Sequence, residues 1–248
     1  MAAPPDRIAM EKDRAARVAV RRVRPGMRVV LGSGTTAAYA IRALAERFGE
    51  SRGVETVASS AASEALAREL GLPVRPLGPG DAFDLMLDGA DEVTPALDLT
   101  KGGGGALFRE KFLARLTREV VILVDHTKLV DRLGSRTAIP IEVVPFARPV
   151  IAERLTRDRF GVRVRPGPDG RPFRTENDHE ILDLSPPAPV DDPAALEATL
   201  RAEPGVVETG LFVGLAHRVY VGRPDDEVEE LVPAPSIAAR RAPTAWRR

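Results

Sequence analysis

Strand-like and helix-like segments alternate along the first half of the chain, and this alternation constrains the fold more than any other feature. Short apolar segments typical of strands occupy residues 27–34, 54–59, 83–92 and 119–125. Each of the first three is followed by a segment with helical apolar spacing. Such a pattern predicts an α/β fold with a parallel sheet and crossover helices. Ligands of parallel sheets bind at the carboxyl ends of the strands, so the loops after these segments are candidate sites.

The pattern changes after about residue 137, where strands, helices and a hairpin-like segment follow one another without regular alternation. We therefore expect a first segment of the parallel-sheet domain over 1–137 and a smaller α+β domain over 138–206. Two apolar segments, VETGLFVG and RVYVG, are expected to rejoin the first sheet, so that residues 207–232 return to the larger domain. Residues 233–248 are rich in proline, alanine and arginine, which is typical of a loose tail.

The composition is that of an ordinary globular protein and gives no sign of a nucleic-acid or membrane partner. Acidic and basic residues balance at 36 each, and 44% of residues are hydrophobic. No apolar run approaches the roughly 20 residues that span a bilayer, and the N-terminal segment lacks the apolar centre of a signal peptide. The absence of cysteine excludes disulfides, zinc–thiolate sites and cysteine nucleophiles. We expect a cytoplasmic protein.

The loop after the first strand-like segment matches a dinucleotide-binding pattern. Gly32, Gly34 and Ala37 fit G-x-G-x-x-A, which is typical of NAD-binding loops. A strand, a glycine loop and a helix N-terminus also form an anion site for a single phosphate. Glycines that serve only a tight turn would give the same pattern, so the motif alone leaves all three interpretations open.

The hydroxyl groups of this loop favour a phosphorylated metabolite over NAD. Ser33, Thr35 and Thr36 add donors that a dinucleotide loop does not require. A dinucleotide fold also needs an acid about 20 residues further on, at the end of the second strand. That strand ends instead in Ser59 and Ser60.

Two acids flank a Gly-Ala turn at the end of the third strand-like segment. Carboxylates in the positions of Asp88 and Asp91 can accept hydrogen bonds from sugar hydroxyls or bind a hard cation. A loop rich in turn-forming aspartate would look the same. His126, His179 and His217 are scattered without metal-ligand spacing, so we expect no metal.

A run of four glycines, 102–105, follows Lys101 and leads into a predicted helix that contains Glu110. Consecutive glycines let the backbone approach a ligand closely but lose much conformational entropy on folding. A carboxylate near the start of a helix at the rim of a pocket can act as a general base, and a lysine can stabilise an oxyanion. Glu110 and Lys111 on a solvated helix face would be the structural alternative.

Lysine is scarce in this chain. Of the 36 basic residues only Lys12, Lys101, Lys111 and Lys128 are lysine, and the remaining 32 are arginine. Lysine presents a compact, rotatable point charge, whereas arginine presents a planar fork. A site that needs the former would resist the general bias, although chance also accounts for so small a number.

Together, a phosphate loop, a carboxylate base, a lysine and hydroxyl-binding acids suit proton transfer next to a carbonyl. Aldose–ketose isomerisation through an enediolate needs one base and electrophilic help for the developing oxyanion. It needs no redox cofactor.

The chain resembles ribose-5-phosphate isomerase type A. The motifs GSGTTA, DGADE, KGGGGALFREK and DHTK, beginning at residues 32, 88, 101 and 125, occur in the order and approximate spacing of that family. The likeness spans roughly residues 15–225. It implies interconversion of D-ribose 5-phosphate and D-ribulose 5-phosphate in the non-oxidative pentose phosphate pathway, without metal or cofactor, in a homodimer or homotetramer. It also implies a Rossmann-like α/β domain with a smaller α+β domain inserted before the final strands.

The resemblance assigns roles to individual residues. Glu110 matches the general base, and Asp88, Asp91 and Lys101 match positions that hold the sugar and assist ring opening and enediolate stabilisation. The residues implied to bind substrate are Ser33, Gly34, Thr35, Thr36, Lys101, Gly102, Gly103, Gly104 and Lys128.

Five positions depart from the family pattern. The first loop usually reads G-T-G-S-T, so Ser33 and Thr35 exchange one hydroxyl residue for another. Phe108 stands where threonine is usual, beside Glu110. His126 and Thr127 replace a small residue and a serine, which bears on local contacts and on pH behaviour.

Rival functions share parts of this motif set. A non-catalytic sugar-phosphate sensor would need a DNA-binding module, and only about 28 residues precede the first strand. A coenzyme A transferase of related fold would use a glutamate as nucleophile, and it shares fewer of the motifs. An NAD-dependent oxidoreductase lacks the expected acid.

Overall fold

The computed structural model describes residues 5–49 and 53–234. They form two compact units. Of the described residues, the first unit comprises 5–49, 53–90, 109–128 and 214–234, and the second comprises Asp91–Phe108 and Leu129–Val213. Two of the points where the chain passes from one unit to the other lie inside the motifs DGADE and KGGGGALFREK.

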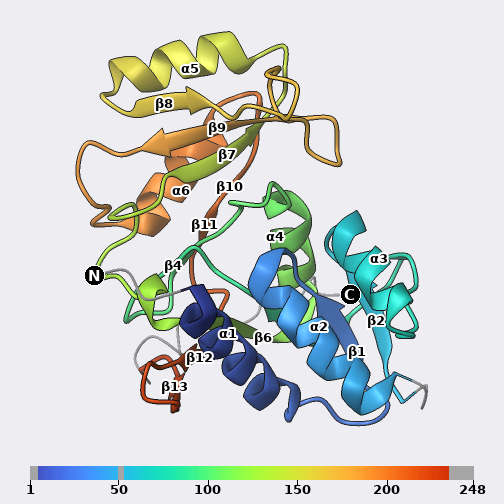
Figure 1. Ribbon diagram of the computed structural model, residues 1–248. Coiled ribbons are helices and arrows are strands. Elements are labelled where there is room, and N and C mark those ends of the chain that lie inside the picture. The colour runs from blue at the N-terminus through green and yellow to red at the C-terminus, as the bar shows by residue number, and fades with distance from the viewer. Residues whose placement is uncertain (1–4, 50–52, 235–248) are drawn as a thin grey trace. The chain divides into compact units, whose positions relative to one another are not determined.

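A six-stranded sheet, ordered β13-β12-β6-β3-β1-β2, forms the centre of the first unit (Figure 1). Five of its strands run parallel, and β13 joins β12 as an antiparallel edge strand. The strands are β1 (Arg28–Leu31), β2 (Glu55–Ala58), β3 (Phe83–Asp88), β6 (Thr117–Asp125), β12 (Arg218–Gly222) and β13 (Val228–Leu231). The predicted α/β class is therefore confirmed.

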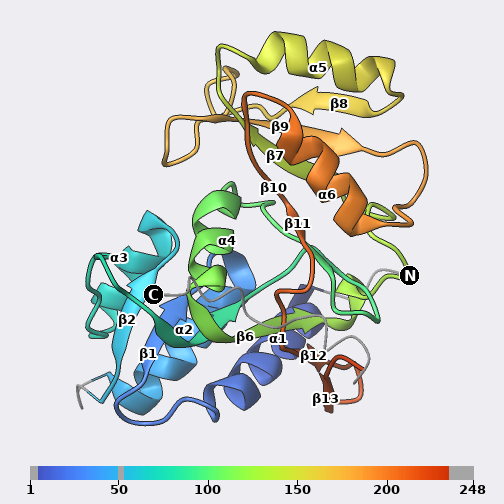
Figure 2. The ribbon, with the colours of Figure 1, turned by 180° about the vertical axis from the view of Figure 1, so that it is seen from behind.

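Four helices belong wholly or mainly to this unit: α1 (Pro5–Val20), α2 (Gly34–Phe48), α3 (Ala61–Glu69) and α4 (Leu107–Arg115). Helix α1 packs against α2 and against strands β6 and β12, while α3 packs against α2 and β2 (Figure 1). Figure 2 shows α4 on the side of the sheet that faces away from the viewer in Figure 1. Gly222 allows the close approach of α1, because a Cβ there would lie 2.1 Å from the backbone oxygen of Glu11.

The core beneath α1, α2 and α3 follows the two-residue period of the strands. Alternate strand residues face these helices and are fully buried: Val29, Leu31, Leu85, Leu87, Val121 and Leu123. The intervening residues Val30, Met86 and Ile122 are buried as well. Strands that are apolar on both faces are expected in a parallel sheet covered on both sides.

Two serines lie at the start of α3. The cap is Ser60, whose side-chain oxygen accepts a hydrogen bond from the backbone N–H of Ser63 at 3.2 Å. Ser63 lies inside the first turn and donates its own hydroxyl to the carbonyl of Gly32 at 2.7 Å. Either serine could supply the capping oxygen, so only the extended backbone at Ser60 decided between them.

The second unit contains two antiparallel sheets. One is ordered β10-β7-β9-β8 and the other β11-β5-β4. Their strands are β4 (Glu92–Val93), β5 (Leu99–Thr100), β7 (Ile139–Val143), β8 (Gly161–Val164), β9 (Glu180–Ser185), β10 (Val206–Thr209) and β11 (Leu211–Phe212). Helices α5 (Arg148–Arg157) and α6 (Pro193–Ala202) supply Ile151 and Leu200 to a core shared with β7 and β9.

The segment VETGLFVG does not rejoin the first sheet. Its residues form β10, which pairs with β7, and β11, which pairs with β5. Only RVYVG, as β12, adds to the parallel sheet beside β6. Open antiparallel edges on β7 and β5 satisfy the backbone groups of β10 and β11, and sequence pattern alone cannot choose between such edges. Of the predicted tail, residues 235–248 lie outside the described residues.

None of the helices in the described part of the chain combines the length and the apolar character that crossing a membrane requires.

Candidate active site

The ends of two adjacent strands place the predicted phosphate loop beside one of the predicted acids. In the register of the sheet Leu31 pairs with Leu87, so β1 and β3 end side by side. Gly32 and Asp88 are the next residues along the chain, and the amide of Gly32 donates to the carbonyl of Leu87 at 2.9 Å. The expectation that these loops meet at the carboxyl edge of the sheet is confirmed within the first unit.

Asp88 is held rigidly at this edge. Its side chain is fully buried, and Oδ1 accepts hydrogen bonds from the backbone N–H groups of Ser33 at 3.2 Å and Gly89 at 2.8 Å. A Cβ on Gly32 would lie only 2.1 Å from Oδ1. The first glycine of the G-x-G pattern is therefore required by the carboxylate that packs against it.

Ser33 links the phosphate loop to the predicted general base. It occupies the N-cap position of α2 but makes no side-chain capping bond. Its hydroxyl donates instead to Oε1 of Glu110, which lies in the first turn of α4 and is only 3% exposed. Gly34 opens α2 with a φ of +82°, a conformation that favours glycine. The first unit thus brings together Ser33, Asp88 and Glu110.

The remaining loop residues lie at the start of α2, where Thr35 is exposed and Thr36 is buried. Lys12 of α1 reaches this point, with Nζ 3.3 Å from Thr35 Oγ1 and 3.9 Å from Oδ2 of the buried Asp125. Lysine scarcity singled out Lys12 in the sequence, but no motif assigned it a contact. Lys128 lies half-buried at the end of the short helix η1 (His126–Lys128) that follows β6.

His126, one of the departures from the family pattern, pairs with an acid on α1. Its Nδ1 lies 2.6 Å from Oε2 of Glu11, and its backbone N–H donates to the same oxygen at 3.3 Å. The Glu11 side chain is completely buried, while that of His126 is 30% exposed. The larger residue at position 126 is therefore accommodated by a charged partner 115 positions away in sequence.

The second unit holds the other two predicted catalytic residues on neighbouring segments. The backbone N–H of Asp91 donates to the carbonyl of Thr100 at 2.8 Å, and its Oδ2 accepts the N–H of Gly103 at 2.9 Å. Lys101 is 4% exposed, and its Nζ lies 5.4 Å from the ring centroid of Phe212 in a cation–π contact. Asp91 and Gly103 are therefore in direct contact, and the buried Lys101 lies two residues before Gly103 in the sequence.

Two positions of the glycine run have a backbone conformation that favours glycine. Gly102 and Gly105 have φ values of +103° and +85°. A Cβ on Gly105 would also lie 2.6 Å from the ring of Phe173. Gly103 and Gly104, between them, are exposed. Phe108, which also departs from the family pattern, is half-buried in the first turn of α4.

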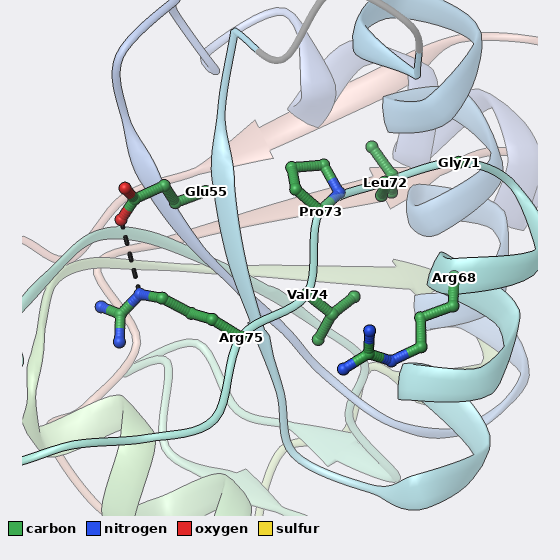
Figure 3. Close-up of a pocket in the computed structure, with 7 residues that line it drawn as sticks. All are labelled: Glu55, Arg68, Gly71, Leu72, Pro73, Val74 and Arg75. Atoms are coloured by element: carbon green, nitrogen blue, oxygen red, sulfur yellow. Dashed lines mark ion pairs between the residues drawn. The ribbon is translucent and has the colours of Figure 1, made fainter.

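A separate hollow of about 550 Å³ lies at the amino end of β2, away from all these residues (Figure 3). Glu55, Arg68 and Arg75 are its charged lining residues. Both arginines already bind carboxylates, because Arg75 pairs with Glu55 and Asp81 and Arg68 pairs with Glu64. This hollow opens at the opposite end of the strands from Asp88, and it contains none of the predicted site residues.

Within the described residues no group of three or more histidine, aspartate or glutamate side chains has the arrangement of a metal site.

These features define an α/β protein with a mainly parallel central sheet, additional small antiparallel sheets, and buried acids at the carboxyl ends of its strands. A family model described as ribose 5-phosphate isomerase A (phosphoriboisomerase A) matches residues 55–226. The chain belongs to this family of isomerases.

Similar proteins cover most of the chain. Ribose-5-phosphate isomerase A of Chloroflexus aurantiacus is 49% identical over 86% of this chain and 90% of its own length. That of Deinococcus radiodurans is 46% identical over 90% and 97%. Among solved structures, ribose 5-phosphate isomerase from Plasmodium falciparum superposes with a TM-score of 0.86 at 30% identity, covering 90% of this chain and 98% of that one. A D-ribose-5-phosphate isomerase in complex with phospho-erythronic acid gives 0.85 at 37% identity, covering 90% and 97%.

Proposed function

We propose that this chain interconverts D-ribose 5-phosphate and D-ribulose 5-phosphate by proton transfer through an enediolate, with Glu110 as the base. The observation that carries the proposal is the buried Glu110 carboxylate, which accepts the Ser33 hydroxyl at the start of the phosphate loop. A base and an anion-binding loop that share a hydrogen bond can act on the two ends of one small phosphorylated substrate.

The proton moves between neighbouring carbons of the open-chain sugar. Glu110 takes the proton from C2 of the aldose while the C1 carbonyl oxygen gains the electron pair and becomes an enediolate oxygen. The same carboxyl group returns the proton to C1, and the hydroxyl proton on O2 passes to O1, which leaves a ketone at C2. No atoms or electrons enter or leave, so the reaction needs no redox cofactor.

The other predicted catalytic residues support this transfer. Lys101 supplies a positive charge for the developing oxyanion. Asp88 and Asp91 accept hydrogen bonds from sugar hydroxyls and assist ring opening. Asp88 suits such a role because two backbone amides fix its carboxylate before substrate arrives.

Substrate phosphate is proposed to bind at the loop Ser33–Thr36, with Lys128 as a further charged contact. The start of α2 offers backbone N–H groups and a positive dipole end. Gly102, Gly103 and Gly104 are proposed to contact the sugar. The similar isomerase solved with phospho-erythronic acid, a phosphorylated four-carbon sugar acid, supports a ligand of this size and charge.

Replacement of Glu110 by glutamine tests the mechanism directly. Isomerisation of ribose 5-phosphate should fall by about 10³-fold or more, while phospho-erythronic acid still binds, because only the base is lost. Turnover within about tenfold of wild type would refute the assignment of the base. A wild-type chain that binds the sugar phosphate without turnover would point instead to a sensor.

We further propose a cytoplasmic enzyme of the pentose phosphate pathway that assembles as a homodimer or homotetramer. Size-exclusion chromatography with light scattering would measure the assembly, and a monomer at micromolar concentration would contradict it.

A further inference from the structure

The glycine run is bound by one arginine that no motif assigned. Nη1 of Arg165 donates to the carbonyl oxygens of Gly102 at 2.8 Å and Gly103 at 3.0 Å. All three residues belong to the second unit. The Arg165 side chain is only 14% exposed, and its bond to the Gly102 carbonyl is partly buried.

Hydrogen bonds hold both the side chain and the backbone of Arg165 in place. Its Nε donates to Asp183 Oδ2 at 3.2 Å and its Nη2 donates to Oδ1, which makes a two-point contact with a carboxylate that is 6% exposed. Its backbone N–H donates to Ile181 at 2.9 Å, and its carbonyl accepts the N–H of Phe173 at 2.8 Å. One guanidinium therefore joins a buried acid of β9 to two successive peptide groups of the glycine run, which the single point charge of a lysine could not reproduce.

The two carbonyls determine where the neighbouring amides point. In a trans peptide the C=O and N–H groups point in opposite directions. Holding the Gly102 carbonyl toward Arg165 turns the N–H of Gly103 away from it, and this N–H is the one that donates to Asp91 Oδ2 at 2.9 Å. A continuous series of hydrogen bonds therefore connects Asp183, through Arg165 and the glycine peptides, to the carboxylate of Asp91.

A glycine run needs such a restraint more than any other sequence. Each glycine has a wide range of backbone conformations, and both Gly103 and Gly104 are exposed. Without an external partner the peptide planes at these positions could rotate, and Asp91 would lose its fixed donor.

We propose that Arg165 is a positioning residue for the isomerase reaction: it locks the peptide planes of Gly102 and Gly103 and thereby fixes the Asp91 carboxylate. This inference rests on the proposed function, because it assumes that Asp91 and the glycine run bind the sugar. Arg165 acts through the loop and is not itself a catalytic residue.

The chain offers a matched control two residues away. Arg163 also donates to Asp183, with Nη2 3.3 Å from Oδ2, but its side chain is 72% exposed. The contacts to the Gly102 and Gly103 carbonyls come instead from Arg165. Arg163→Met and Arg165→Met each remove one positive charge and one partner of the same carboxylate, but Arg165→Met also removes the two-point contact with Asp183 and the contacts to the loop.

The test compares steady-state kinetics with ribose 5-phosphate, thermal unfolding, and amide hydrogen exchange of residues 101–105 in these variants. Arg165→Met should lower kcat/KM by about 100-fold and speed exchange in the glycine run, because small displacements of positioned groups cost about this much. Arg163→Met should stay within about threefold, as for an exposed ion pair. Arg165→Lys, which keeps the charge without the fork, should lie between them.

Equal kcat/KM values for the two methionine variants would overturn the inference. If Arg165→Met does not fold, full activity in folded Arg165→Lys would overturn it equally. A wild-type chain without isomerase activity would refute the proposed function instead, and the exchange rates of residues 101–105 would still show whether Arg165 restrains the loop.

Discussion

Gly32→Ala is the sharpest test of the geometry around Asp88. The added Cβ would lie 2.1 Å from Asp88 Oδ1 and 2.2 Å from Cγ, whereas ordinary contacts begin near 3.4 Å. The carboxylate would have to move by more than 1 Å. It cannot move freely, because Oδ1 accepts the amides of Ser33 and Gly89 and the side chain is fully buried.

The expected decrease in the free energy of unfolding follows from the loss of those two hydrogen bonds. Bonds to a charged group contribute about 1.5–3 kcal/mol each, so losing both would lower the free energy of unfolding by about 3–6 kcal/mol. For a chain of this size that corresponds to a fall in Tm of about 10 °C. A displacement of this extent at a carboxylate proposed to bind substrate should also lower kcat/KM by about 100-fold.

Differential scanning calorimetry and an isomerase assay on Gly32→Ala would measure both effects. Gly78→Ala is the matched control in the same unit, because the nearest atom to its Cβ would be Asp81 Oδ2 at an ordinary 3.8 Å. The control should shift Tm by less than about 2 °C. A Gly32→Ala protein with the Tm and activity of the control would refute the claim that Asp88 fixes this glycine.

Three further outcomes follow from other contacts. His126→Ala should lower stability by about 2 kcal/mol, seen as a lower urea midpoint, because the buried Glu11 carboxylate then keeps, among the described residues, the amide of residue 126 and Arg7 at 4.0 Å. Adding Glu11→Gln should recover part of the loss, and no recovery would contradict the charge argument. The Arg75 guanidinium, aided by the Gly78 amide, lowers the pKa of Asp81 to about 2. The protein should therefore lose about 1 kcal/mol as the pH falls from about 4 to about 2, and this step should be absent from urea titrations of Asp81→Asn. Isomerase activity should persist in EDTA, and loss that a divalent cation restores would contradict the metal-free mechanism.

The four lysines lie at different depths in the structure. Lys101 and Lys111 are buried, Lys12 reaches the hydroxyl of Thr35 at the start of α2, and Lys128 ends the turn after β6. Lysine presents a compact, rotatable charge at these positions, where arginine would present a planar fork.

Much of the first unit could be predicted from local pattern. Apolar runs such as 119–125 are long enough to be strands buried on both faces, and helical spacing between them requires parallel pairing. Because parallel strands end at one edge, the sequence also predicts that the loop at Gly32 and the acid at Asp88 meet there. These features depend on residues near one another in sequence.

Other features depend on which distant segments become neighbours. The sequence of β10 and β11 is compatible with several sheet edges, and only the fold pairs them with β7 and β5. Arg165 is one of 32 arginines, and the glycine run it holds lies more than 60 positions away. By itself the sequence determined the α/β class and the residue types of the site, because periodicity and motif spacing are local. Only the tertiary structure decided which arginine restrains the glycines and which serine meets Glu110, because hydrogen bonds need positions in space that no local pattern encodes.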